Sequence, residues 1–329
     1  MIIDTHGHYI APSAVTEVEK HPDRYGIRVE RDGDGNPRLG FGGGPLIRPL
    51  RPRLRELEER RELLSRRGVD LQVVYTWLDA VGYALPVEQG AAWCRLQNET
   101  LAADLEGRDE LAGLATVPLQ SGARAAEELS HAVERLGLKG AAVASNVEGR
   151  YFDVPDLAPF WERAEALGVP VVVHPYNVAG RDRMEAYFLH NLVGNPLDTT
   201  LAAATLVLGG VADRHPDLKV VLVHGGGCLP YLIGRLQWGY EQYPQHMGDG
   251  IQRPPAEYLT WFYYDTLLYH APNIRHMVDL VGADRVLMGT DYPFPIGDPD
   301  PVGTVEKAAL APEARRKIMQ TNPQSLFGL

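Results

Sequence analysis

Eight short apolar runs alternate with helical patterns along almost the whole chain, and this alternation leaves few possible folds. The runs are centred near residues 2, 70, 112, 141, 171, 221, 261 and 287. Buried strands separated by amphipathic helices are typical of a parallel sheet, because the crossover helices cover its faces. Eight such units predict an α/β fold of the (β/α)8 TIM-like barrel type, with residues 1–329 as a single barrel domain. A doubly wound open sheet is the alternative.

Residues 11–50 interrupt the alternation directly after the first strand. Two β-prone segments flank the turn-forming residues Asp32–Pro37, a pattern that predicts a small β-hairpin insertion. Glycines and prolines then indicate a mobile connection that carries Arg48 and Arg51.

Two further segments are predicted to be helical. Leucines spaced among charged residues predict an amphipathic helix from Arg53 to Arg67, ended by Gly68. Residues 183–213 are expected to form two helices, and their alanine- and leucine-rich part is too short to span a membrane.

The net charge of the chain argues against two classes of binding partner, nucleic acids and anionic membranes. The chain is acidic, with a formal net charge of -11 and a pI near 5.5. Nucleic acids and anionic membranes bind basic surfaces, so neither is an expected partner. The chain lacks a signal-peptide pattern and any apolar stretch near the roughly 20 residues of a membrane span. Its two cysteines, Cys94 and Cys228, are too few for a disulfide framework, and we predict a cytoplasmic protein.

Four polar residues stand at the carboxyl ends of predicted strands. His6 and His8 end the first strand, where the alternation of side chains points both imidazoles the same way. His174 ends the fifth strand and Asp291 follows the eighth. Such an open set of nitrogen and oxygen donors suits zinc or a similar divalent ion. A barrel gathers its strand ends at one mouth, so this placement favours the barrel over the open sheet.

His224 ends the sixth strand and precedes three glycines at 225–227. It has two possible roles, a further metal ligand or an acid and base beside the metal. We favour the second, because histidine exchanges protons near neutral pH. The glycines are expected to leave room for a ligand. Asp265, which ends the seventh strand, is predicted either to orient His224 or to be a plain strand-end acid.

Seven short motifs carry a resemblance to a known family. They are Asp4-Thr5-His6-Gly7-His8, His174-Pro175-Tyr176, Arg183-Met184, Leu192-Val193-Gly194, Val223-His224-Gly225-Gly226-Gly227, Gly234-Arg235 and Gly289-Thr290-Asp291-Tyr292-Pro293-Phe294-Pro295. In combination they resemble the aminocarboxymuconate semialdehyde decarboxylase branch of the amidohydrolase superfamily (amidohydrolase 2 type). The resemblance covers nearly the whole chain, including the hairpin insertion and residues 322–329. It implies the metal-dependent hydrolase type of barrel.

The resemblance implies a metal-dependent, non-oxidative decarboxylase (a carboxy-lyase) of a small unsaturated or aromatic carboxylic acid. The four strand-end residues would hold the metal. His224 would activate the metal-bound water and protonate the substrate, and Asp291 is expected to be catalytic as well as a metal ligand. Arg48, with Arg51 as the alternative, and Arg235 would grip the substrate carboxylate, since a guanidinium fork binds two oxygens at once. In the family this second arginine enters the neighbouring subunit's site, which implies a homodimer.

A single metal ion is expected. Binuclear barrels of this kind use a bridging lysine at the end of a middle strand, but here the fourth strand ends in Ala144-Ser145-Asn146 and Lys139 lies at its start. Zinc is the expected ion and manganese the alternative.

Tyr176, Phe188 and Phe294 are expected to line the substrate pocket. The named decarboxylases carry tryptophan at the first two positions and match at the third, so the change predicts a smaller aromatic wall that admits an aromatic carboxylate. A hydrolase or hydratase, which would use the same water as a nucleophile, is the alternative enzyme. A barrel that binds metal only structurally is the non-enzyme alternative, and the open, cysteine-free ligand set argues against it.

Overall fold

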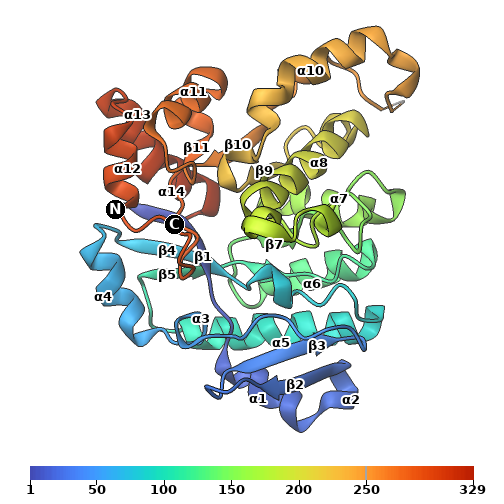
Figure 1. The fold of residues 1–329 in the computed structure, drawn as a ribbon, viewed down its shortest axis with the longest axis vertical. Helices are drawn as coiled ribbons and strands as arrows, with labels where there is room; N and C mark the ends of the chain where they lie inside the picture. The colour runs from blue at the N-terminus through green and yellow to red at the C-terminus, as the bar shows by residue number, and fades with distance from the viewer. Residues whose placement is uncertain (249) are drawn as a thin grey trace.

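The computed structural model describes residues 1–248 and 250–329, and its centre consists of two parallel sheets (Figure 1). The first has the strand order β1-β4-β5 and the second the order β11-β10-β9-β8-β7-β6. The strands are β1 (Ile3–His8), β4 (Leu71–Tyr75), β5 (Leu111–Gly113), β6 (Ala115–Thr116), β7 (Ala141–Ala144), β8 (Pro170–His174), β9 (Lys219–Leu222), β10 (Phe262–Asp265) and β11 (Val286–Leu287). The predicted parallel α/β architecture is confirmed.

Backbone contacts link the two sheets at both ends. Only Leu114 separates β5 from β6, and its N–H donates to the carbonyl of Val74 over 2.9 Å. At the other end, the N–H of Thr5 in β1 donates to Met288, just after β11, over 2.8 Å. The first strand therefore lies beside the last one, although they are almost the whole chain apart.

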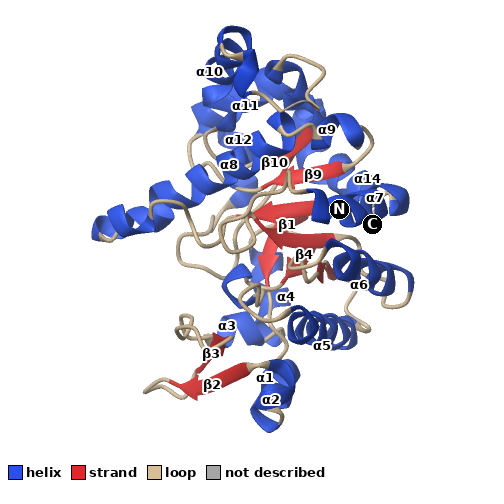
Figure 2. Cartoon of the chain, turned by 90° about the vertical axis from the view of Figure 1, so that its right-hand side faces the viewer, coloured by secondary structure: helices blue, strands red, loops and turns tan. Residues whose placement is uncertain are grey.

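Helices cover the outside of the strands (Figure 2). They are α4 (Glu58–Arg66), α5 (Val87–Leu105), α6 (Gly122–Glu134), α7 (Ala158–Leu167), α8 (Asn195–Leu208), α9 (Val211–Arg214), α10 (Leu229–Gln242), α11 (Ala271–Val281), α12 (Pro301–Lys307), α13 (Pro312–Arg316) and α14 (Asn322–Phe327). The predicted boundary signals explain some of their ends. Gly168, for example, adopts the left-handed conformation that ends α7. Most strand residues are apolar and buried, as expected for a parallel sheet with helices on its outside.

The insertion after β1 contains a two-stranded antiparallel sheet at the bottom of Figure 1. Strand β2 (Ile27–Arg31) pairs with β3 (Pro37–Phe41). Two helices that the sequence analysis missed precede it, α1 (Pro12–Lys20) and α2 (Pro22–Tyr25). Each begins with a proline, whose fixed φ and missing N–H suit the first helical position.

Two helix predictions were wrong in detail. The helix expected from Arg53 to Arg67 is divided into α3 (Pro52–Arg55) and α4, because Glu56 between them has an extended backbone. In residues 183–213 only α8 and α9 are regular α-helices. Before α8 the chain forms short 3-10 turns at Arg181–Arg183 and Ala186–Phe188 and a π-helical stretch at His190–Gly194. Tyr187 and Phe188 have positive φ angles of 56° and 60°, which an α-helix does not accommodate.

None of the helices among the described residues combines the length and apolar character needed to cross a membrane.

Candidate metal centre and active site

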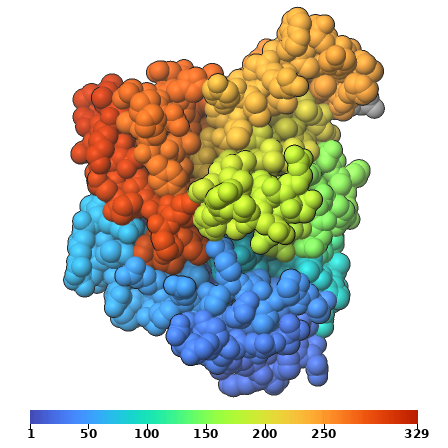
Figure 3. Space-filling model, viewed as in Figure 1, coloured from blue at the N-terminus to red at the C-terminus, as the bar shows by residue number. Residues whose placement is uncertain are grey.

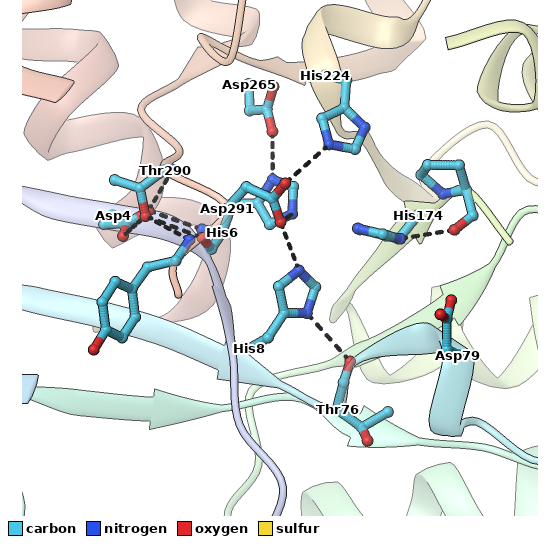
Figure 4. Close-up of polar contacts among 12 residues, drawn as sticks. Asp4, His6, His8, Thr76, Asp79, His174, His224, Asp265, Thr290 and Asp291 are labelled. Carbon is cyan, nitrogen blue, oxygen red and sulfur yellow. Dashed lines mark hydrogen bonds and ion pairs between the residues drawn. The ribbon is translucent and has the colours of Figure 1, made fainter. Parts of the chain in front are cut away.

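The fold brings His6, His8, His174 and Asp291 together at one end of the strands (Figure 4). One potential ligand atom from each side chain lies within 4.8 Å of the others, and all four residues are buried. Among the described residues this is the one such group of histidines, cysteines and carboxylates. The four residues that the sequence analysis selected as metal ligands are therefore neighbours in space.

Hydrogen bonds hold the imidazoles with one nitrogen directed at the centre of the group. His174 Nδ1 lies 2.9 Å from the carbonyl oxygen of Pro175, so its Nε2 is left as the free nitrogen. His8 Nε2 lies 3.0 Å from Asp291 Oδ1, and its Nδ1 lies 3.4 Å from the carbonyl oxygen of Thr76. Backbone carbonyls behind histidine ligands are a common way to fix their tautomer and ring orientation.

Asp265 contacts His6, which corrects one prediction. Its Oδ2 lies 2.8 Å from His6 Nδ1, and its Oδ1 accepts from the backbone N–H of Gly225 over 2.9 Å. The carboxylate therefore lies against His6 and makes no hydrogen bond to the ring of His224, although it accepts from the backbone just after His224. The sequence analysis could not choose the correct histidine, since His6 is 259 residues away along the chain.

The donor set fits a divalent cation. His6 Nε2 is buried and has no hydrogen-bond partner, although it lies 3.4 Å from Asp291 Oδ1. Burial and the neighbouring imidazoles hold the pKa of His174 well below its ordinary value, so that ring is neutral and keeps its lone pair. Burial alone would raise the pKa of Asp291, but the imidazoles of His224 and His8 lower it well below its ordinary value. Burial also lowers the pKa of His8, whereas Asp265 and Asp291 outweigh burial and raise that of His6, so a bound cation would displace a proton from His6.

His224 lies at the edge of this group and outside the four-residue set. Its Nε2 is 3.7 Å from Asp291 Oδ2, and its ring centroid is 5.4 Å from that of His174. Its Nδ1 is buried without a partner. Both His224 and Asp291 have positive φ angles, 54° and 59°, and such strained backbone is concentrated at functional sites.

The three glycines after His224 serve packing, which corrects the expectation that they leave room for a ligand. All three have positive φ, a conformation that favours glycine. A Cβ on Gly225 would lie 2.4 Å from Leu268, and one on Gly227 would lie 2.1 Å from the carbonyl oxygen of Pro196. The glycines therefore allow the sharp turn that presents His224.

Asp4 was missed as a member of the site. Its buried carboxylate accepts from Thr290 Oγ1 over 2.6 Å, from Gln72 Nε2 over 2.5 Å and from the backbone N–H of His6 over 3.0 Å. It thus joins β1 to β4 and to the residue before Asp291. The available sequence signal was an acid directly after the apolar pair Ile2-Ile3, in a strand predicted to be buried.

Arg60 was also missed, because it lies among the charges of α4 and resembles a solvated residue. It is 1% exposed. Its guanidinium donates to the carbonyl oxygen of His8 over 2.7 Å and to Gln72 Oε1 over 2.8 Å, and it stacks 4.7 Å from the centroid of the Tyr292 ring. Arg60 therefore fixes the backbone of His8, a candidate metal ligand, through this hydrogen bond.

The predicted substrate-binding residues lie in several places. Phe294 contacts the His8 ring, with 5.2 Å between centroids, and is therefore next to the metal group. Tyr176 is partly buried and donates from its hydroxyl to Glu148 over 3.1 Å. Phe188 is 43% exposed and contacts His190. Arg235 is exposed on α10, the helix that projects at the upper right in Figure 3.

Arg48 and Arg51 differ in their surroundings. Arg48 lies over the ring of Trp77, at 4.7 Å from the centroid, and Trp77 contacts Phe294 at 5.6 Å. Arg51 instead lies near Asp32 in the hairpin turn, where its charge adds to the backbone hydrogen bond from Asn36 in lowering the pKa of Asp32.

Comparisons with known proteins identify relatives of this chain. The chain is 33% identical over 286 residues to 2-amino-3-carboxymuconate-6-semialdehyde decarboxylase of Dictyostelium discoideum, covering 87% of this chain and 78% of the relative. It is 30% identical over 314 residues to gamma-resorcylate decarboxylase of Rhizobium sp. (strain MTP-10005), covering 88% and 93%.

A solved structure gives the same result. Dihydroxybenzoic acid decarboxylase from Polaromonas sp. JS666, with bound manganese and the inhibitor 2-nitroresorcinol, superimposes with a TM-score of 0.81 at 25% identity, covering 100% of this chain and 97% of that one. These relatives confirm the prediction of a metal-dependent decarboxylase. Residues 3–329 match the family described as Amidohydrolase, and the chain therefore belongs to the amidohydrolase family.

Proposed function

We propose that the protein catalyses the metal-dependent, non-oxidative decarboxylation of a small unsaturated or aromatic carboxylic acid. The observation that carries the proposal is the group of three histidines and Asp291 with His224 beside it. The decarboxylase relatives support the same reaction class.

One divalent ion, with zinc as our first choice and manganese as the second, would be held by His6, His8, His174 and Asp291. When bound, it would supply positive charge that polarises a substrate oxygen and stabilises charge developing on the substrate. The manganese in the Polaromonas enzyme keeps the second choice open.

His224 is the proposed acid and base. An imidazole that is not a ligand can deliver a proton to the substrate carbon that bears the carboxylate. The C–C bond to the carboxylate then breaks, its electron pair returns to the conjugated system of the substrate, and carbon dioxide leaves. A C–H bond thus replaces the C–C bond, and no oxidant or reductant is needed. Asp291, 3.7 Å away, would stabilise the protonated form of His224 before the transfer.

Arg48 is the proposed carboxylate-binding residue of the insertion. Its stacking on Trp77, next to Phe294, supports it over Arg51. Phe294 and Tyr176 are the proposed walls of the pocket, with Phe188 on the exposed segment before α8.

A homodimer is the proposed assembly, with Arg235 entering the neighbouring site. Helix α10 exposes Tyr231 to 86% and Trp238 to 62%, and large exposed apolar side chains of this kind commonly mark interfaces. Arg235 lies on the same helix.

The whole chain is proposed to be one closed eight-stranded barrel, in which β5 and β6 together form the third strand. The links from Leu114 to Val74 and from Thr5 to Met288 support closure. Residues 11–50 are the proposed inserted lid, and a cytoplasmic location is proposed from the cysteine content.

The proposed function is tested by a screen of unsaturated and aromatic carboxylates for release of carbon dioxide. We expect release from at least one acid, loss of activity after chelation, and recovery with zinc or manganese. Addition of water to a substrate without carbon dioxide release would identify a hydratase or hydrolase instead. Activity that persists in metal-free protein would exclude the mechanism.

A further inference from the structure

The arginine proposed to bind the carboxylate is held by the loop that follows β4. Arg48 Nη2 lies 3.3 Å from Asp79 Oδ2, and the same guanidinium lies over the ring of Trp77. The ion pair and the cation–π contact are two separate interactions with one short loop. They act on a side chain that is 56% exposed and would otherwise sample many rotamers.

The loop itself is rigid, and this makes it a suitable support. Leu78 and Ala80, on either side of Asp79, are fully buried, and Trp93 donates from its indole N–H to the carbonyl of Ala80 over 2.8 Å. Asp79 is therefore a partly exposed carboxylate on a fixed backbone. In Figure 4 its carboxylate rises toward the side of the site on which His174 lies.

The backbone around Arg48 is held from the other side. The N–H groups of Ile47 and Leu50 donate to carbonyls of β3, at Leu39 and Pro37, each over 2.8 Å. Only the side chain of Arg48 is left to be positioned, and Trp77 and Asp79 do this. Among the described residues Arg48 makes one side-chain hydrogen bond, through Nη2, so the rest of its guanidinium fork is available to a second carboxylate.

Burial raises the pKa of Asp79, and the charge of Arg48 opposes this rise, with smaller contributions from Arg181 and His190 in the segment before α8. The carboxylate thus stands where three separate parts of the chain meet: the insertion, the loop after β4 and the segment before α8. A single acid between Arg48 and Arg181 can hold both guanidinium groups in place without cancelling their attraction for an anionic substrate, whereas burial lowers the pKa of His190 and favours its neutral form.

We propose that Asp79 and Trp77 are positioning residues, which hold the Arg48 guanidinium over the mouth of the site in the orientation that receives the substrate carboxylate. This inference rests on the proposed function of Arg48. The contacts from Asp79 and Trp77 would contribute to substrate binding, because preorganising an arginine reduces the entropy lost when the carboxylate binds.

The first experiment needs no substrate. The metal-loaded protein is treated with phenylglyoxal, which modifies exposed arginines, and the rate at each arginine is followed by mass spectrometry. Asp79→Asn should increase the rate at Arg48 several-fold and leave the rate at Arg28 unchanged. The matched control is Glu30→Gln, which breaks the exposed Arg28–Glu30 pair at 2.9 Å and should increase the rate at Arg28 only. An unchanged rate at Arg48 in Asp79→Asn would overturn the proposal.

The second experiment uses whichever acid releases carbon dioxide in the screen. Asp79→Asn should raise KM roughly twofold to tenfold with little change in kcat, and the effect should disappear in the Arg48→Ala background. A KM effect of equal size without Arg48 would show that Asp79 acts by another route and would overturn the proposal. If the wild-type chain releases carbon dioxide from no acid, the proposed function and the substrate-binding role fail together. The phenylglyoxal modification rates then show separately whether Asp79 holds Arg48.

Discussion

His6 Nδ1 and Asp265 Oδ2 lie 2.8 Å apart, and both side chains are buried. A carboxylate only accepts hydrogen bonds, so we assign the proton of the neutral ring to Nδ1, which leaves the lone pair on Nε2. That nitrogen faces the candidate metal position without another partner.

Asp265→Asn should therefore weaken metal binding by about tenfold to a hundredfold, the usual cost of losing a carboxylate behind a histidine ligand. Competition against a chromogenic chelator measures the affinity. Asp284→Asn is the control, because the same change is made on a side chain that is 70% exposed. Equal affinities in the two variants would contradict the assigned role.

His224→Ala should keep its metal and lose turnover by roughly 10²- to 10⁴-fold, the range expected for loss of a general acid or base. His174→Ala should lose the metal as well. Metal analysis of the two purified variants, combined with carbon dioxide release, separates these outcomes. Loss of metal from His224→Ala would make His224 a ligand.

Arg235→Ala and His224→Ala chains should each be inactive alone and partly active when mixed, since one site in the mixed dimer would contain both wild-type residues. Carbon dioxide release is measured after subunit exchange, and mass spectrometry establishes that mixed dimers form. Mixed dimers without recovered activity would exclude a shared site.

Arg60→Met should lower the free energy of unfolding by about 2–4 kcal/mol, because it leaves the carbonyl of His8 and the side chain of Gln72 buried without their donor. Urea denaturation at fixed metal content measures the change. Arg66→Met, on the same helix but 69% exposed, should change it by less than about 0.5 kcal/mol. Similar losses in both variants would mean that the buried contacts contribute little.

The sequence was sufficient to predict where the strands lie and which polar residues stand at their ends. Apolar runs such as Val171–Val173 have few other uses than a buried strand, and a polar residue directly after such a run has a fixed position at the sheet edge. This explains why the sequence alone places His174 and Asp291 at the ends of strands.

The pairings between distant residues could not be predicted. Periodicity shows that Asp265 ends a strand but not which imidazole it meets, because that depends on register and side-chain direction across the fold. The burial of Arg60 could not be predicted for a related reason. Its neighbours in sequence are charged and exposed, and only the contact between α4 and β1 shows that its guanidinium is buried.

The first strand carries His8 and the segment after the last strand carries Asp291, which lie 3.0 Å apart in space and 283 residues apart in sequence. During synthesis, a ribosome must therefore complete nearly all of the chain before Asp291 can reach His6, His8 and His174. Capture of a metal ion at this site would then be a late event in maturation, and the ion would join the two ends of the fold. An ion that closes so long a loop would oppose the separation of these ends on unfolding, so we expect loss of the metal to favour unfolding from the contact between β1 and the segment after β11.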